Sequence, residues 1–133
     1  MLTLKPHFII IDDNKLDCFI ADKIITNKDE YSSIRSFTEA NKALEYIENL
    51  PVGTDGRQTI IIVDIQMPVM NGFEFVEAFE KLSLDIKSAY SIFMISSSDN
   101  ESDRNRMRNY PSVKQLLSKP LNKEALADIL DRL

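Results

Sequence analysis

The sequence is poor in the residues that form disulfides and common metal sites. It has one cysteine, Cys18, one histidine and no tryptophan. A single cysteine cannot form an intrachain disulfide, which favours a reducing, cytoplasmic location. One histidine and one cysteine cannot form the usual zinc sites. Any metal here would therefore be bound by oxygen atoms, and Cys18, which lies in a helical pattern, is expected to be a small core or boundary residue.

Long apolar runs and an excess of positive charge are also absent. No apolar run approaches the roughly 20 residues that cross a bilayer, and the N-terminus lacks the apolar core of a signal peptide. A net charge of -5 argues against direct nucleic-acid binding, which needs a basic surface. With 133 residues, 44% apolar and 28% charged, the chain is expected to be one domain over 1–133, its core about 6–133.

What the sequence does contain is an alternation of strand and helix patterns. The expected strands are 8–11, 33–37, 59–63, 91–95 and 113–117. The run over 59–63 has no polar alternation, which is typical of a strand buried on both faces. Helical spacing follows each strand. This predicts an α/β fold, a (βα)5 doubly wound parallel sheet of the flavodoxin-like strand order 2-1-3-4-5.

The helix patterns give more local expectations. Bulky apolar residues at 16, 19, 20 and 24 predict the buried face of the first helix, which Asn14 or Asp13 could cap. Thr38 is the expected cap of the second helix. Residues 51–56 are a loop by composition, and 83–90 are expected to be an irregular connection. The helix at about 100–109 is polar, with Met107 almost its only apolar residue, so it should be the least firmly packed.

Chemically active side chains follow four of the five strands. Asp12 and Asp13 follow the first strand, Asp64 the third, Ser96 the fourth and Lys119 the fifth. Parallel strands open at one edge of the sheet, where ligands bind. Carboxylates brought together there repel by about 4 kcal/mol per pair at 4 Å and an effective dielectric near 20. A divalent cation would offset this repulsion. All-oxygen ligands suit Mg²⁺, which commonly binds carboxylates together with phosphate oxygens.

Each of these residues also has a simpler structural interpretation. The two neighbouring acids could cap the first helix, Ser96 could bond to local backbone, and Lys119 could be an ordinary surface lysine. An aspartate after a strand is often a turn residue. Their joint occurrence at one sheet edge favours a functional site for a metal and a phosphoryl group.

The motifs themselves resemble a known family. They are Ile11-Asp12-Asp13, the Asp-x-x-Met-Pro-x-Met-x-Gly pattern of residues 64–72, Ile95-Ser96-Ser97, and Ser118-Lys119-Pro120. In this order and spacing they are similar to the receiver domain of two-component response regulators, of the chemotaxis-type single-domain fold. The resemblance covers essentially all 133 residues.

This resemblance implies roles for the acidic residues. Asp64 would be the phosphoacceptor, taking a phosphoryl group from a sensor histidine kinase or a histidine phosphotransfer protein. Mg²⁺ would be the cofactor, held directly by Asp13, through water by Asp12, and by Asp64 and the main-chain carbonyl of Gln66.

The resemblance also implies roles at the last two strands. Ser96 would be the hydroxyl that moves to hydrogen-bond the phosphoryl group, and Lys119 would bind a phosphoryl oxygen. The Lys119–Pro120 peptide is usually cis in the family. The family signals to a downstream protein partner through the face formed here by helix 100–109, strand 113–117 and the last helix, with phosphorylation-dependent dimers possible.

One departure concerns the signal itself. The family often has an aromatic residue three positions before the lysine, and here that position is Leu116. Either another side chain reports phosphorylation, with Tyr110 the nearest aromatic in the sequence, or the signal relies on movement of the polar helix.

The expected function is therefore a stand-alone signalling receiver without an output domain. It is not an enzyme toward an external substrate, although it catalyses its own aspartyl phosphorylation and dephosphorylation. One alternative is a small phosphatase-like hydrolase with an aspartyl nucleophile, which usually has a second acid where this chain has Gln66. Another is a pseudo-receiver that acts without phosphorylation.

Overall fold

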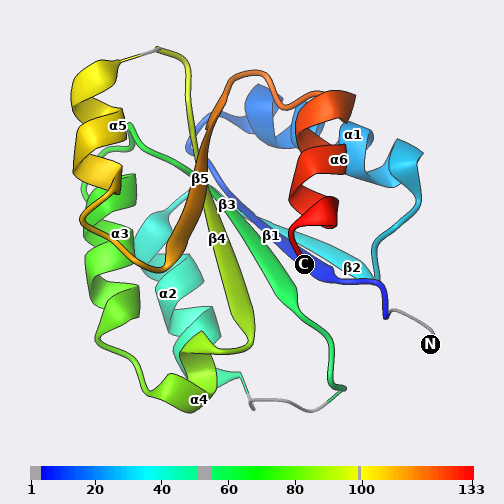
Figure 1. Cartoon of the computed structure of the whole chain (residues 1–133), viewed down its shortest axis with the longest axis horizontal. Coiled ribbons are helices and arrows are strands. Elements are labelled where there is room, and N and C mark those ends of the chain that lie inside the picture. The colour runs from blue at the N-terminus through cyan, green and yellow to red at the C-terminus, as the bar shows by residue number, and fades with distance from the viewer. Residues whose placement is uncertain (1–3, 51–54, 99) are drawn as a thin grey trace.

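Apolar strands form the centre of a parallel sheet that helices cover on both faces (Figure 1). The computed structural model describes residues 4–50, 55–98 and 100–133. The strands are β1 (His7–Ile11), β2 (Ser33–Phe37), β3 (Thr59–Asp64), β4 (Tyr90–Ser96) and β5 (Val113–Ser118). Their order is β2-β1-β3-β4-β5, and every neighbouring pair is parallel. The predicted fold and strand order are confirmed.

The helices divide between the two faces of the sheet. They are α1 (Lys15–Lys28), α2 (Ala40–Asn49), α3 (Gly72–Glu80), α4 (Leu84–Lys87), α5 (Glu101–Met107) and α6 (Lys123–Asp131). Figure 1 shows α1 and α6 on one face and α2, α3 and α5 on the other. Successive residues of a strand point to opposite faces. Ile9 of β1 accordingly packs with α2 and α3, and its neighbour Ile10 packs with α1 and α6.

The buried face of α1 differs from the prediction. Leu16 is 64% exposed and Phe19 is 58% exposed, whereas the helix buries Cys18, Ala21 and Ile25. Leu16 and Phe19 thus lie on the side of the helix opposite to the buried residues. Ile20 and Ile24, which belong to the same predicted face, are partly exposed, and Ile24 packs against the core as predicted. The prediction followed the larger side chains. Cys18, Ala21 and Ile25 face the sheet instead, and Cys18 is buried as expected.

Three local details concern the helix ends and one connection; the first agrees with the prediction and the other two differ from it. Asn14 caps α1 by accepting hydrogen bonds from the N–H groups of residues 16 and 17 at 2.9 and 3.1 Å. Thr38 is not the cap of α2: the helix begins one residue later than expected, so that Glu39 takes that place. The connection over 83–90 contains the short helix α4, which is too brief to show a helical period.

The polar helix is packed as weakly as expected. It is shorter than predicted, since α5 ends at Met107, and none of its described residues is fully buried. The loop predicted for 51–56 falls largely outside the described residues. Within the described parts of the chain, no helix has the length and apolar character needed to cross a membrane.

Candidate functional site

The carboxyl ends of the strands bring the predicted residues to one edge of the sheet. Strand register sets Ile11 beside Val63, and Asp64 beside Ile95. Asp12 leaves β1 next to the end of β3. The N–H of Lys119 donates to the main-chain oxygen of Ser96 at 2.8 Å, which joins the ends of β4 and β5. The pairing of the buried strands therefore fixes the backbone positions from which these side chains extend.

Three carboxylates gather at this edge. One carboxylate oxygen from each of Asp12, Asp13 and Asp64 lies within 4.8 Å of the others. Asp12 is 3% and Asp64 is 4% exposed, whereas Asp13 is exposed. The main-chain N–H of Gln66, whose carbonyl is the fourth predicted ligand, donates to Asp64 Oδ1 at 3.2 Å. An all-oxygen set with one solvent-facing carboxylate has the donor chemistry of a magnesium site.

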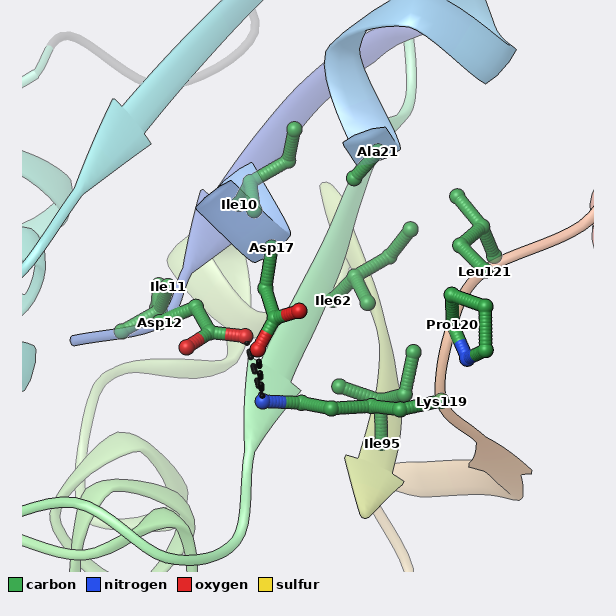
Figure 2. Close-up of a pocket in the computed structure, with 10 residues that line it drawn as sticks. All are labelled: Ile10, Ile11, Asp12, Asp17, Ala21, Ile62, Ile95, Lys119, Pro120 and Leu121. Carbon is green, nitrogen blue, oxygen red and sulfur yellow. Dashed lines mark hydrogen bonds and ion pairs between the residues drawn. The ribbon is translucent and has the colours of Figure 1, made fainter. Parts of the chain in front are cut away.

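Lys119 supplies the positive charge of the site. Its Nζ lies 2.8 Å from Asp12 Oδ2, 2.9 Å from Asp17 Oδ2 and 3.2 Å from Asp64 Oδ2. The lysine side chain is only 13% exposed. Figure 2 shows its nitrogen at the two carboxylates of residues 12 and 17, with the aliphatic stem leading back to β5. Lys119 is therefore not an ordinary surface lysine. Its peptide bond to Pro120 is cis, as the family resemblance implies.

Sequence reasoning missed Asp17. It lies in the first turn of α1, which looks like a favourable position for an acid at a helix N-terminus and nothing more. The one available signal was its closeness to Asp12 in the sequence, since the first turn of a helix that begins shortly after the strand stays near the strand end. This closeness predicts a contact only if the residue at which α1 begins is already known.

Burial and charge shift the ionisation of the central pair. Burial, together with the charge of Asp12, raises the pKa of Asp64 to about 6, although Lys119 and the N–H of Gln66 oppose this. Burial would lower the pKa of Lys119, but hydrogen bonds from the ammonium to Asp12 and Asp17 outweigh it and raise that pKa above its usual value. Lys119 therefore remains an ammonium, and Asp64 is a carboxylate at neutral pH.

Ser96 reaches the same edge but bonds locally. Its hydroxyl accepts a hydrogen bond from the Ser98 N–H at 3.2 Å and lies 3.4 Å from the Ser98 hydroxyl. The residue is 2% exposed. This is the local contact expected of a hydroxyl at a strand end, so a role toward a phosphoryl group stays a prediction.

The turn that carries Asp64 is closely packed around Gly72. The N–H of Gly72 donates to the main-chain oxygen of Ile65 at 2.9 Å, and Asn71 caps α3 in a reciprocal pair with Glu74. A Cβ at Gly72 would lie 2.6 Å from the main-chain oxygen of Asp64. The start of α3 thus approaches the backbone of Asp64 closely.

At the departure from the family pattern, Leu116 packs against the apolar core on the α2 and α3 side of the sheet. The Tyr110 ring lies 5.8 Å from the Phe73 ring of α3, measured between centroids. The guanidinium of Arg106 lies 4.3 Å from the centroid of the same Phe73 ring. Tyr110 and α5 are both in contact with α3, so these contacts distinguish neither of the two signalling alternatives from the other.

Comparisons with known proteins agree with this geometry. A family model described as the response regulator receiver domain matches residues 8–131. A response regulator receiver protein from Dyadobacter fermentans is 34% identical, with a TM-score of 0.85 and 95% of each chain covered. A two-component response regulator from Cytophaga hutchinsonii is 26% identical, with a TM-score of 0.86 and coverage of 98% of this chain and 97% of that one.

A chemotaxis response regulator from Vibrio cholerae has the same fold. It is 22% identical, with a TM-score of 0.75, and the match covers 96% of this chain and 97% of that one. A search of curated proteins gave no match.

Proposed function

Because the chain belongs to the response regulator receiver domain family, we propose that Asp64 is the phosphoacceptor of a two-component or phosphorelay system. The observation that carries the proposal is the environment of this one carboxylate. It is buried, it lies in a group with two further acids within 4.8 Å, and its Oδ2 is 3.2 Å from Lys119 Nζ. A buried acid surrounded by acids and one fixed ammonium suits the binding of a cation and an anion together.

The reaction is a transfer of a phosphoryl group from nitrogen to oxygen. A lone pair of an Asp64 carboxylate oxygen attacks phosphorus in line, and the P–N bond of the partner's phosphohistidine breaks. The electron pair of that bond stays with the imidazole nitrogen. Because the other ring nitrogen keeps its proton, the imidazole is released as a neutral ring. The product is a phosphoaspartate. Since the pKa of Asp64 is about 6, the attacking carboxylate is ionised at neutral pH.

The surrounding residues have complementary roles in this proposal. Asp12, Asp13, Asp64 and the main-chain carbonyl of Gln66 would hold Mg²⁺, which neutralises charge on the phosphoryl oxygens when bound. Lys119 binds a phosphoryl oxygen as a fixed positive charge. Ser96 would leave its contact with Ser98 to hydrogen-bond another phosphoryl oxygen.

Labelling with acetyl phosphate tests this function directly. We expect the chain to gain one phosphate that is stable in acid and labile in base, and only when Mg²⁺ is present. With EDTA, labelling should fall to background because the acidic group then repels the dianionic donor. Intact-protein mass spectrometry measures the outcome. Absence of labelling with Mg²⁺ contradicts the proposal, and repeated turnover of a general phosphate ester would favour the hydrolase alternative.

The exposed face of α1 suggests where the phosphohistidine partner binds. Leu16 and Phe19 lie three residues apart on the solvent side of the helix. The first turn of this helix reaches the site through the contact of Asp17 with Lys119. We propose that the phosphohistidine-bearing partner covers this apolar pair when it brings its imidazole to Asp64.

Phe19→Ala should separate the two phosphate donors. We expect transfer from a phosphorylated partner to slow by roughly tenfold or more, because an aromatic anchor is lost from the interface. Labelling by acetyl phosphate should not change, because this small donor needs no docking surface. Leu84→Ala is the matched control, since Leu84 is 75% exposed on α4, far from α1 (Figure 1). Equal slowing with both donors would place the defect in the site and contradict a docking role.

A further inference from the structure

Lys119 is held by a carboxylate that belongs to neither the nucleophile nor the acidic group. Asp17 Oδ2 accepts a hydrogen bond from Lys119 Nζ at 2.9 Å, across 102 positions of sequence. The Asp17 side chain is 28% exposed and the lysine side chain 13%. The contact joins the first turn of α1 to the residue that follows β5 (Figure 2).

The ammonium has a carboxylate for each of its donors. A lysine ammonium has three N–H groups. The acceptors within reach are Asp12 Oδ2 at 2.8 Å, Asp17 Oδ2 at 2.9 Å and Asp64 Oδ2 at 3.2 Å. The two shorter contacts are to residues that are not the nucleophile. With these two acceptors in place, the nitrogen is kept beside Asp64 Oδ2, which is the longest of the three contacts.

Asp17 lies outside the group that could hold a metal. That group comprises Asp12, Asp13 and Asp64 among the described residues, and Asp17 contributes no oxygen to it. Asp17 therefore acts on Lys119 rather than on a cation. The Lys119 stem cannot hold the ammonium in place by itself, because a lysine side chain has several rotatable bonds and a compact head group.

We propose that Asp17 is a positioning residue for phosphorylation of Asp64. It fixes the Lys119 ammonium jointly with Asp12, so that the ammonium stays beside the Asp64 carboxylate, where it binds an oxygen of the incoming phosphoryl group. The inference rests on the proposed function, in that Lys119 binds the phosphoryl group. It adds to the site a residue of α1, which lies outside the motifs that follow the strands.

The geometry can be tested without metal or phosphate. In metal-free protein containing ¹⁵N-lysine, the Lys119 ammonium should give an NMR signal from slowly exchanging protons, because three carboxylates hold it. Asp17→Ala should broaden or remove this signal. Asp22→Ala should preserve it, because Asp22 lies farther along α1 and bonds to Thr26 instead. An unchanged signal in Asp17→Ala overturns the proposal.

The kinetic test separates positioning from charge. At saturating Mg²⁺, we expect Asp17→Ala to lower the maximal rate of labelling by acetyl phosphate roughly 10- to 150-fold, the range for one lost hydrogen bond to a charged group. The half-saturating donor concentration should change far less. Asp17→Asn should give an intermediate rate, because its amide oxygen still accepts from Lys119. Asp22→Ala should label like wild type.

Two results would overturn the role of Asp17. If the Ala and Asn variants both label faster at a lower donor concentration, Asp17 acts only by repelling the donor. If both keep the wild-type maximal rate and are merely less stable, the contact is only structural. A wild-type chain that is not labelled contradicts the proposed function instead, and the metal-free spectrum then still reports whether Asp17 holds Lys119.

Discussion

Asp64→Asn should abolish labelling by acetyl phosphate while making the metal-free protein more stable at neutral pH. Labelling stops because an amide oxygen is a poor nucleophile, and in the proposed arrangement the neighbouring acids Asp12 and Asp13 hold Mg²⁺ instead of attacking phosphorus. Stability rises because the substitution removes a buried negative charge that lies beside Asp12. A loss of activity together with a gain in stability distinguishes a functional residue from a structural one.

The pH dependence of stability identifies Asp64 as the source of this gain. Its pKa is raised to about 6 in the folded chain, against about 4 in the unfolded chain. The folded state therefore binds more protons between these values, and its stability falls as the pH rises from about 4 to about 6. The loss should be on the order of 2 kcal/mol. Above about pH 6, the ionisation of Asp64 causes no further loss of stability.

Urea unfolding in EDTA across this pH range measures the effect. Other acids titrate in both proteins, so the difference between wild type and Asp64→Asn isolates Asp64. Asp85→Asn is the control, because Asp85 lies exposed on α4, and it should keep both wild-type labelling and the wild-type pH profile. Labelling of Asp64→Asn at the wild-type level would refute the assignment of the phosphoacceptor.

The site could be found from the sequence because its parts follow directly from strands. Asp12, Asp64 and Lys119 each come within a residue of a strand's end, and parallel pairing alone brings strand ends to one edge. Their positions depend little on how the helices pack. The fold was predictable for a related reason, since short unbroken apolar runs such as 60–63, each followed by a helical pattern, are typical of strands covered on both faces.

The features that were missed depend on how a helix rotates. Asp17 reaches Lys119, and Phe19 reaches solvent, because α1 turns Cys18, Ala21 and Ile25 toward the sheet. The sizes of the side chains favour burial of the face with Leu16 and Phe19. The sequence alone does not show which of the two faces of the helix packs against the sheet. The hydrophobic period places a helix on the sheet but does not by itself choose between two stripes of similar spacing.

Weak packing of α5 has a similar consequence for signalling. No described residue of α5 is fully buried: Met107 packs at the edge of the core, and Arg106 contacts Phe73 and forms an ion pair of 3.9 Å with Glu77. Exposed ion pairs contribute little to stability. Movement of this helix therefore costs less free energy than movement of a buried one. This makes the second signalling alternative, in which the helix itself moves, physically feasible, while the contact of Tyr110 with Phe73 leaves the first one open.

Gly72→Ala should reduce both stability and labelling, although alanine favours helices more than glycine does. The added Cβ would lie 2.6 Å from the main-chain oxygen of Asp64 and 2.9 Å from the Cα of Ile65. Both are backbone atoms, so either α3 or the end of β3 must shift. We expect a loss of about 2–3 kcal/mol in the free energy of unfolding, as for other overpacked sites. Labelling should fall by up to about 100-fold, since a displacement near 1 Å has that effect on a reacting group.

Gly56→Ala separates steric contact from backbone conformation. Gly56 has a φ of +71°, and its added Cβ would meet only the Leu4 side chain at 3.9 Å. We expect a loss of about 1 kcal/mol in the free energy of unfolding, because alanine is strained in a left-handed backbone conformation. Labelling should not change, because Gly56 follows Asp55, which contacts His7 at the end of β1 opposite to Asp12. Urea unfolding and acetyl phosphate labelling of both variants give the comparison. If Gly72→Ala matched wild type in both, the close approach of α3 would not be what fixes Asp64, and strand pairing alone would hold the nucleophile in place.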